Sequence, residues 1–182
     1  MNKIILLALA AFMVIGCNAP EEKKKDKFSA EYQLLSTIWF QKSAEQKALF
    51  HQAYNIAKMR IDEIGKQTYE KPVAVVLDID ETVLDNSPFQ GWCIKNDSAF
   101  NKKSWHRWVL MEEAAPLTGA LDFTNYAQKQ NIEVIYISNR HVSDLEATIN
   151  NMKELGFPNA DADHIFLKDS TSDKTIRRNL VS

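Results

Sequence analysis

Residues 73–85 read V-A-V-V-L-D-I-D-E-T-V-L-D, and this stretch decides the fold. Its five leading apolar residues (73–77) form an uninterrupted run, which is typical of a strand buried on both faces of a parallel sheet. Asp78 and Asp80 follow where that strand would end. Ligands of open α/β sheets bind beyond the carboxyl ends of the strands, so the pair stands where a functional site is expected.

Two carboxylates at this spacing have a clear chemical use. Side chains two residues apart on a strand share a side, so Asp78 and Asp80 could hold one cation, and Mg²⁺ prefers such oxygen ligands together with a substrate phosphate. One aspartate could then attack phosphorus, while the other serves as general acid and base. The alternatives are a solvated strand end or a calcium loop, and the latter is disfavoured because a strand precedes the motif.

A second predicted strand, residues 132–137 (I-E-V-I-Y-I), ends in polar residues. Ser138, Asn139 and Arg140 offer a hydroxyl, an amide and a guanidinium, a set that suits an anion. Taken alone, the same tripeptide is ordinary turn chemistry. Its position after a strand favours a phosphate-binding segment over a plain turn.

Residues 164–168 (H-I-F-L-K) predict a third, short strand, and a polar loop follows it. Thr171 or Ser172 is expected to cap a helix that carries Lys174 in its first turn, where the helix dipole also attracts phosphate. We expect Arg177 and Arg178 to lie on the surface. Alternation of strands and helices predicts right-handed crossovers and a Rossmann-like parallel sheet.

Two helical regions flank the aspartate motif. The N-terminal part, within residues 28–71, is helical to about Lys66, with a capping box at Ser43 and one apolar face predicted from residues 49, 53, 56, 57, 61 and 64. Residues 86–117 form an insertion with four apolar residues at helical spacing: Trp105, Trp108, Val109 and Met111. Packing of these side chains within the domain explains that spacing. The alternative is a cap over the active site, whose tryptophans stack on a nucleobase or another apolar leaving group.

The first 16 residues are typical of a lipoprotein signal peptide. Lys3 precedes an apolar run that is shorter than the roughly 20 residues a membrane span needs. V-I-G-C (14–17) resembles a lipobox, which implies that Cys17 is lipidated; an uncleaved anchor predicts nearly the same location. A charged tether (17–27) then leads to one domain, residues 28–182. We expect an exported protein at a bacterial outer membrane or cell surface, facing the periplasm or the exterior.

The composition disfavours several other classes of function. The 24 acidic and 22 basic residues give a net charge of −2, which offers no argument for nucleic-acid binding. Cys93 is the only cysteine besides Cys17, so an intrachain disulfide within the mature domain is excluded. The lack of clustered cysteines and histidines disfavours zinc chemistry.

The string D-I-D-E-T-V-L-D-N (78–86) resembles motif I of the haloacid dehalogenase superfamily, and most closely that of the class C acid phosphatases. This bacterial lipoprotein family includes 5′-nucleotidases. W-F-Q-K-S-A-E (39–45) resembles the family's segment before motif I, Ser138 matches motif II, and S-D-K-T-I-R-R (172–178) resembles motif III. Phe89 departs from the family pattern, which usually has tyrosine at this position.

The resemblance implies a role for each matching residue. Asp78 becomes the nucleophile and Asp80 the acid and base, and both become Mg²⁺ ligands, Asp80 also through its carbonyl. Ser138 would hold the transferring phosphoryl group, with Asn139 and Arg140 as substrate-binding neighbours. Lys174 would neutralise the phosphate charge and orient the nucleophile.

Family members continue into a further strand and an acidic loop, G-D-N-x-x-D-F, which nothing after Lys174 matches. The resemblance places that strand beside the motif I strand, so we expect residues 73–77 to form an unpaired edge and Mg²⁺ binding and turnover to be weak. The leading hypothesis is a membrane-tethered phosphomonoesterase that acts on small phosphate esters, nucleotides among them, through an aspartyl-phosphate. The alternative is a truncated, non-catalytic lipoprotein that binds phosphate ligands, or a gene fragment. The oligomeric state is left open.

Overall fold

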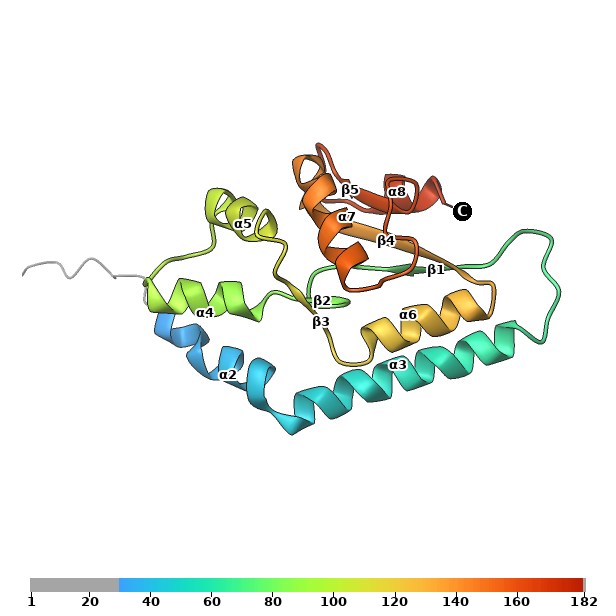
Figure 1. Cartoon of the computed structure of the whole chain (residues 1–182), viewed down its shortest axis with the longest axis horizontal. Helices are drawn as coiled ribbons and strands as arrows, with labels where there is room; N and C mark the ends of the chain where they lie inside the picture. The colour runs from blue at the N-terminus through green and yellow to red at the C-terminus, as the bar shows by residue number, and fades with distance from the viewer. Residues whose placement is uncertain (1–29, 182) are drawn as a thin grey trace, which may run out of the picture.

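The computed structural model describes residues 30–181, so the predicted signal peptide, Cys17 and the tether lie outside the described residues. A three-stranded sheet in the order β1-β4-β5 forms the centre (Figure 1). Its strands are β1 (Ala74–Leu77), β4 (Glu133–His141) and β5 (Ile165–Lys168). Both neighbouring pairs are parallel, which confirms the predicted α/β fold.

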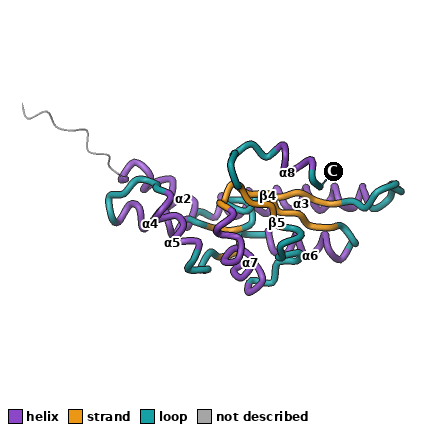
Figure 2. The backbone as a smooth tube through the Cα atoms, turned by 90° about the horizontal axis from the view of Figure 1, so that it is seen from above, coloured by secondary structure: helices purple, strands orange, loops and turns teal. Residues whose placement is uncertain are grey.

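Helices cover both sides of this sheet. Helices α6 (Ala120–Lys129) and α7 (Leu145–Glu154) lie on one side, and the short α8 (Thr175–Asn179) lies on the other (Figure 2). A 3-10 turn, η3 (Val142–Asp144), joins β4 to α7. Residues of β4 and the helices beside it form the centre of the core, with the following side chains almost fully buried: Phe123, Val134, Tyr136 and Met152.

Strand β1 is less buried than the sequence predicts. Val76 is 43% exposed, and residues 73–77 are all exposed or half-buried. The reason is that β1 stands at the edge of the sheet in the described part of the chain, with β4 as its neighbour there. The apolar run therefore predicted a strand correctly, and the expected edge position is found in the described part of the chain, but burial on both faces was wrong.

The N-terminal part consists of η2 (Ala30–Gln33), α2 (Leu34–Lys42) and the long helix α3 (Ala44–Ile64). Ser43 caps α3 as predicted, since its Oγ accepts a hydrogen bond from the Gln46 amide at 3.1 Å. The predicted apolar face is only half right, because Leu49 and Ile56 are both 52% exposed. The helix instead packs on α6 through Tyr54, whose ring lies 5.3 Å from that of Phe123.

The insertion after the aspartate motif forms a small layer of its own. Strands β2 (Leu84–Asp85) and β3 (Ala115–Pro116) pair antiparallel and bracket α4 (Ser87–Lys95) and α5 (Lys102–Val109). Trp108 and Val109 are buried, whereas Met111 is 54% exposed. None of the helices within residues 30–181 is long and apolar enough to cross a membrane.

Candidate active site

Asp78 stands directly after β1 and is held by a cation from a distant segment. Its Oδ2 lies 2.6 Å from Lys174 Nζ, and its Oδ1 accepts a hydrogen bond from the Ile79 amide at 2.8 Å. The Asp78 side chain is still 41% exposed. A carboxylate that is oriented on one side and open on the other is accessible to a ligand.

Lys174 reaches Asp78 from the end of the loop that follows β5. Helix α8 begins one residue later, at Thr175, so the prediction that Lys174 lies in the first helical turn was wrong by one position. The predicted cap at Thr171 or Ser172 was also wrong, because Asp173 Oδ1 accepts from the Thr175 amide at 2.9 Å. That bond holds the pKa of the Asp173 carboxyl below its usual value.

Asp80 is fixed by donors from two other elements. Its Oδ1 accepts from Asn86 Nδ2 at 3.0 Å and from Arg140 Nε at 2.9 Å. Its Oδ2 accepts from Ser138 Oγ at 3.1 Å. The structure therefore brings Asp80, Ser138 and Arg140 together, as the sequence predicts for the carboxyl ends of neighbouring parallel strands.

Strand β4 carries Ser138, Asn139 and Arg140, which the sequence placed after the strand. The register of β4 against β5 shifts between Ile137 and His141, so these polar residues occupy an irregular part of the strand. Arg140 is directed inward: its guanidinium is 1% exposed and binds Asp80. Asn139 is exposed instead.

A tight turn returns the chain beneath Asp80. The amides of Val83 and Leu84 both donate to the Ile79 carbonyl at 2.9 Å, and Glu81 adopts a positive φ of 54° within this turn. Tyr54 of α3 donates its hydroxyl to the Thr82 carbonyl and so ties the turn to the N-terminal helix. Burial raises the pKa of Tyr54 to about 12.

Asn86 belongs to the site although the sequence prediction gave it no role. Its side chain is fully buried, donates to Asp80 and accepts a hydrogen bond from Trp108 Nε1 at 2.8 Å. Its backbone amide donates to Glu81 Oε1 at 3.1 Å. Burial raises the pKa of Glu81, and repulsion from Asp80 adds to that effect. The only sequence signal was the place of Asn86 within the motif I string.

Arg177 was expected on the surface, and that prediction was wrong. The residue is 9% exposed, and its guanidinium donates to the Ser138 carbonyl and, at 2.8 Å, to Asn139 Oδ1. The packing of α8 on the end of β4 buries it, a contact between segments 39 residues apart. Arg177 therefore fixes the segment that carries Ser138.

The described residues supply only part of a divalent-metal site. Asp78 and Asp80 offer carboxylate oxygens, but Lys174 already contacts one oxygen of Asp78, and both oxygens of Asp80 accept hydrogen bonds. Within residues 30–181, no group of three or more His, Cys, Asp or Glu side chains is placed to hold a metal. Octahedral Mg²⁺ coordination is thus not met by these residues, although the resemblance of the aspartate motif implies Mg²⁺.

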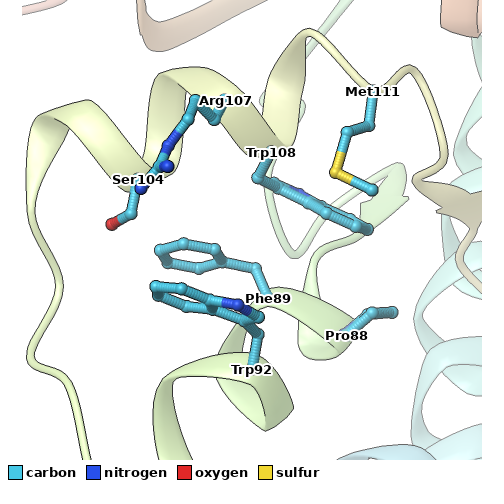
Figure 3. Close-up of a pocket in the computed structure, with 7 residues that line it drawn as sticks. All are labelled: Pro88, Phe89, Trp92, Ser104, Arg107, Trp108 and Met111. Atoms are coloured by element: carbon cyan, nitrogen blue, oxygen red, sulfur yellow. The ribbon is translucent and has the colours of Figure 1, made fainter. Parts of the chain in front are cut away.

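Two pockets lie on opposite sides of α5. The interhelical pocket, about 390 Å³, opens between α4 and α5; Figure 3 shows the rings of Phe89 and Trp92 stacked below Trp108 and Met111. Pro88, Ser104 and Arg107 complete its lining. The basic pocket, about 540 Å³, lies between α5 and the carboxyl ends of β4 and β5. It is lined by Phe100, Lys102, Lys103, Trp105, His106, Asn139, His141, Ser143, Asp144, Lys168, Asp169 and Ser170.

A Rossmann-like sheet with an aspartate pair after β1, a serine near the carboxyl end of β4 and a lysine after β5 defines a haloacid dehalogenase-type protein. Residues 14–181 match the family described as "HAD superfamily, subfamily IIIB (Acid phosphatase)", and the chain belongs to that family. The resemblance seen in the sequence is thereby confirmed.

Two solved structures of the class C acid phosphatase from Bacillus anthracis are similar to this chain, one of them with tungstate bound. In each comparison the identity is 40% and the TM-score 0.80. Each covers 84% of this chain and 64% of the chain of the relative. This protein therefore matches less than two thirds of the length of these relatives.

Proposed function

We propose that this protein is a phosphomonoesterase that hydrolyses small phosphate esters, 5′-nucleotides among the candidates, through an aspartyl-phosphate on Asp78. The observation that carries the proposal is the pairing of an accessible Asp78, held 2.6 Å from Lys174, with an Asp80 bound to Ser138 and Arg140. Family membership and the tungstate-bound relative support it, because tungstate is a tetrahedral oxyanion like phosphate.

In the proposed first step, Asp78 attacks phosphorus, an Asp78–phosphorus bond forms, and the bond from phosphorus to the ester oxygen breaks. The leaving oxygen takes a proton from Asp80, so an alcohol departs. In the second step water attacks the same phosphorus and gives its proton back to Asp80, and cleavage releases phosphate and Asp78. Lys174 offsets the negative charge that gathers beside Asp78.

The hydrogen bonds of Asp80 indicate which of its oxygens would carry the proton. Oδ1 is occupied by the cationic Arg140 and by Asn86, both donors, so a proton there would meet donors on both sides. Oδ2 faces only the Ser138 hydroxyl, which can turn and accept. We therefore assign proton transfer to Oδ2 and a positioning role to Arg140, in place of the substrate contact expected from the sequence.

The decisive measurement is phosphate release from p-nitrophenyl phosphate by the purified full chain, with and without Mg²⁺. We expect magnesium-dependent release, weak because the described metal ligands are incomplete, that disappears in Asp78→Asn. Asp163→Asn is the matched control, since Asp163 is exposed and precedes β5 at the opposite end of the sheet. Activity that survives in Asp78→Asn would refute the proposed nucleophile.

The incomplete metal site favours a second candidate function, a phosphate-binding protein without turnover. This candidate predicts that tungstate or phosphate binds to the chain while no substrate is hydrolysed at any Mg²⁺ concentration. Both candidates require that tungstate binds in a calorimetric titration, and only the enzymatic proposal also requires release of phosphate from p-nitrophenyl phosphate. Binding without release at any Mg²⁺ concentration therefore favours the second candidate.

We also propose export and lipid anchoring at Cys17. The signal-like residues 1–16 and the V-I-G-C string support this location, and both lie outside the described residues. Labelling of expressing bacteria with radioactive palmitate should mark the protein, and Cys17→Ser should lose the label. A labelled Cys17→Ser variant would contradict the anchor.

A further inference from the structure

The basic pocket lies beside the proposed site, although Asp78, Asp80 and Ser138 are not among its lining residues. Asn139 lines it and stands in the chain between Ser138 and Arg140. Trp105 forms another wall, and its ring lies 5.8 Å from the Arg140 guanidinium that holds Asp80. A substrate bound at Asp78 and Ser138 could therefore extend the rest of its structure into this space.

Three lysines line the basic pocket. Lys102 and Lys103, in the first turn of α5, line it from the cap, and Lys168, at the end of β5, lines it from the sheet. Among the residues that the structure describes, none of these three ammonium groups forms an ion pair. Three cations held near one cavity without counter-ions attract an anion.

The acidic residues of the pocket do not cancel this charge. Asp144 is 2% exposed and engages His106 Nδ1, so its carboxylate is already paired within the wall. His106 lines the cavity with Nε2 as its remaining ring nitrogen. Asp169 is the one exposed carboxylate of the lining, and it follows Lys168 in the chain. The net charge of the exposed side chains that line the basic pocket is therefore positive.

We propose that the basic pocket binds a second anionic group on the substrate, so that the preferred esters are phosphate monoesters whose alcohol part carries another phosphate or similar anion. This proposal rests on the proposed function, because it takes Asp78 and Ser138 as the position of the first phosphate. Lys102, Lys103 and Lys168 bind the second group, while Phe100 and Trp105 contact the part between the two. The pocket volume of about 540 Å³ is large enough for a ligand of nucleotide size.

The test compares adenosine 3′,5′-bisphosphate with adenosine 5′-monophosphate, which differ by one phosphate. Calorimetric titration uses the full chain carrying Asp78→Asn, so that no turnover disturbs the binding. We expect the bisphosphate to bind about 10-fold more tightly at low salt, and about 0.5 M salt should reduce the difference.

Substitution of the pocket lysines locates the effect. In the same background, Lys102→Gln/Lys103→Gln and Lys168→Gln should each bring the two affinities closer, and the three changes together should make them equal within about twofold. Lys47→Gln/Lys66→Gln is the matched control, because both lysines are exposed and lie on or just after α3. It should keep the preference.

The outcomes separate this proposal from the proposed function. Binding of the monophosphate with no gain for the bisphosphate overturns the second anion site alone, as does a preference that survives in the triple lysine variant. Failure of both nucleotides to bind overturns the phosphate site itself, and with it both proposals.

Discussion

Removal of the Asp80 carboxylate should destabilise the fold far more than removal of Asp78. The Arg140 guanidinium is 1% exposed, and Asp80 is its charged partner at 2.9 Å. Asp80→Ala leaves that cation buried without a counter-ion and also takes the acceptor from Asn86 and Ser138. Breaking a buried pair in this way costs about 3–5 kcal/mol, a large part of the roughly 5–15 kcal/mol that stabilises a domain.

Asp78→Ala provides the matched comparison. Asp78 pairs with Lys174 at a similar distance, but its side chain is 41% exposed, so solvent screens the pair and the expected loss is about 0–1 kcal/mol. Urea unfolding of both variants, followed by tryptophan fluorescence, gives the two free energies. Asp80→Ala/Arg140→Met should recover part of the loss, because it removes both charges together. A difference below about 1 kcal/mol between the two single variants would refute the assigned role of Arg140.

Three further predictions concern stability. Gly119→Ala should lower the melting temperature more than Gly156→Ala does. Both glycines have positive φ, but only at Gly119 would a Cβ meet Tyr54, at 3.1 Å. Equal shifts of the melting temperature would contradict this. Tyr54→Phe should lower the free energy of unfolding by about 1 kcal/mol, because it removes the hydrogen bond to the Thr82 carbonyl. An unchanged free energy of unfolding would show that this hydrogen bond does not stabilise the fold. Burial opposes protonation of His164, but its bonds to Glu133 and Asp161 raise its pKa. The stability that protonated His164 contributes is therefore complete below the usual pKa of about 6.5 and is lost as the pH rises through the raised value. His164→Gln should flatten the dependence of the unfolding free energy on pH in this range. An unchanged dependence would contradict the raised pKa of His164.

The strands and the main site residues could be predicted because their signals are local. An apolar run followed by D-x-D, and a β-branched run followed by S-N-R, each combine a strand with its polar end in fewer than ten residues. Parallel pairing then brings those ends to one edge of the sheet. Asp80, Ser138 and Arg140 consequently meet as expected.

The missed features depend on contacts between distant segments. Arg177 is buried because α8 lies against the end of β4, which no pattern within residues 172–178 reveals. The apolar residues of α3 lie around much of the helix, so periodicity could not decide between Leu49 and Tyr54 as the packed position. Ser143 and Glu146 form an S-x-x-E pattern that is typical of a helix cap, yet Ser143 lies inside η3, where the His141 ring accepts from its amide at 3.2 Å.

The hydrogen bonds of the two aspartates divide the site into a fixed part and an open part. Asp80 is bound by Ser138 and Arg140 of β4 and by Asn86, and Asn86 is bound in turn by Trp108 of α5. Two hydrogen bonds, from Trp108 to Asn86 and from Asn86 to Asp80, therefore couple the position of the insertion to that of Asp80. Asp78 contacts only its own loop and Lys174 in these interactions, and it stays open to solvent. The residue assigned to proton transfer thus gains a rigid orientation, while the residue assigned to attack keeps the access that a ligand needs.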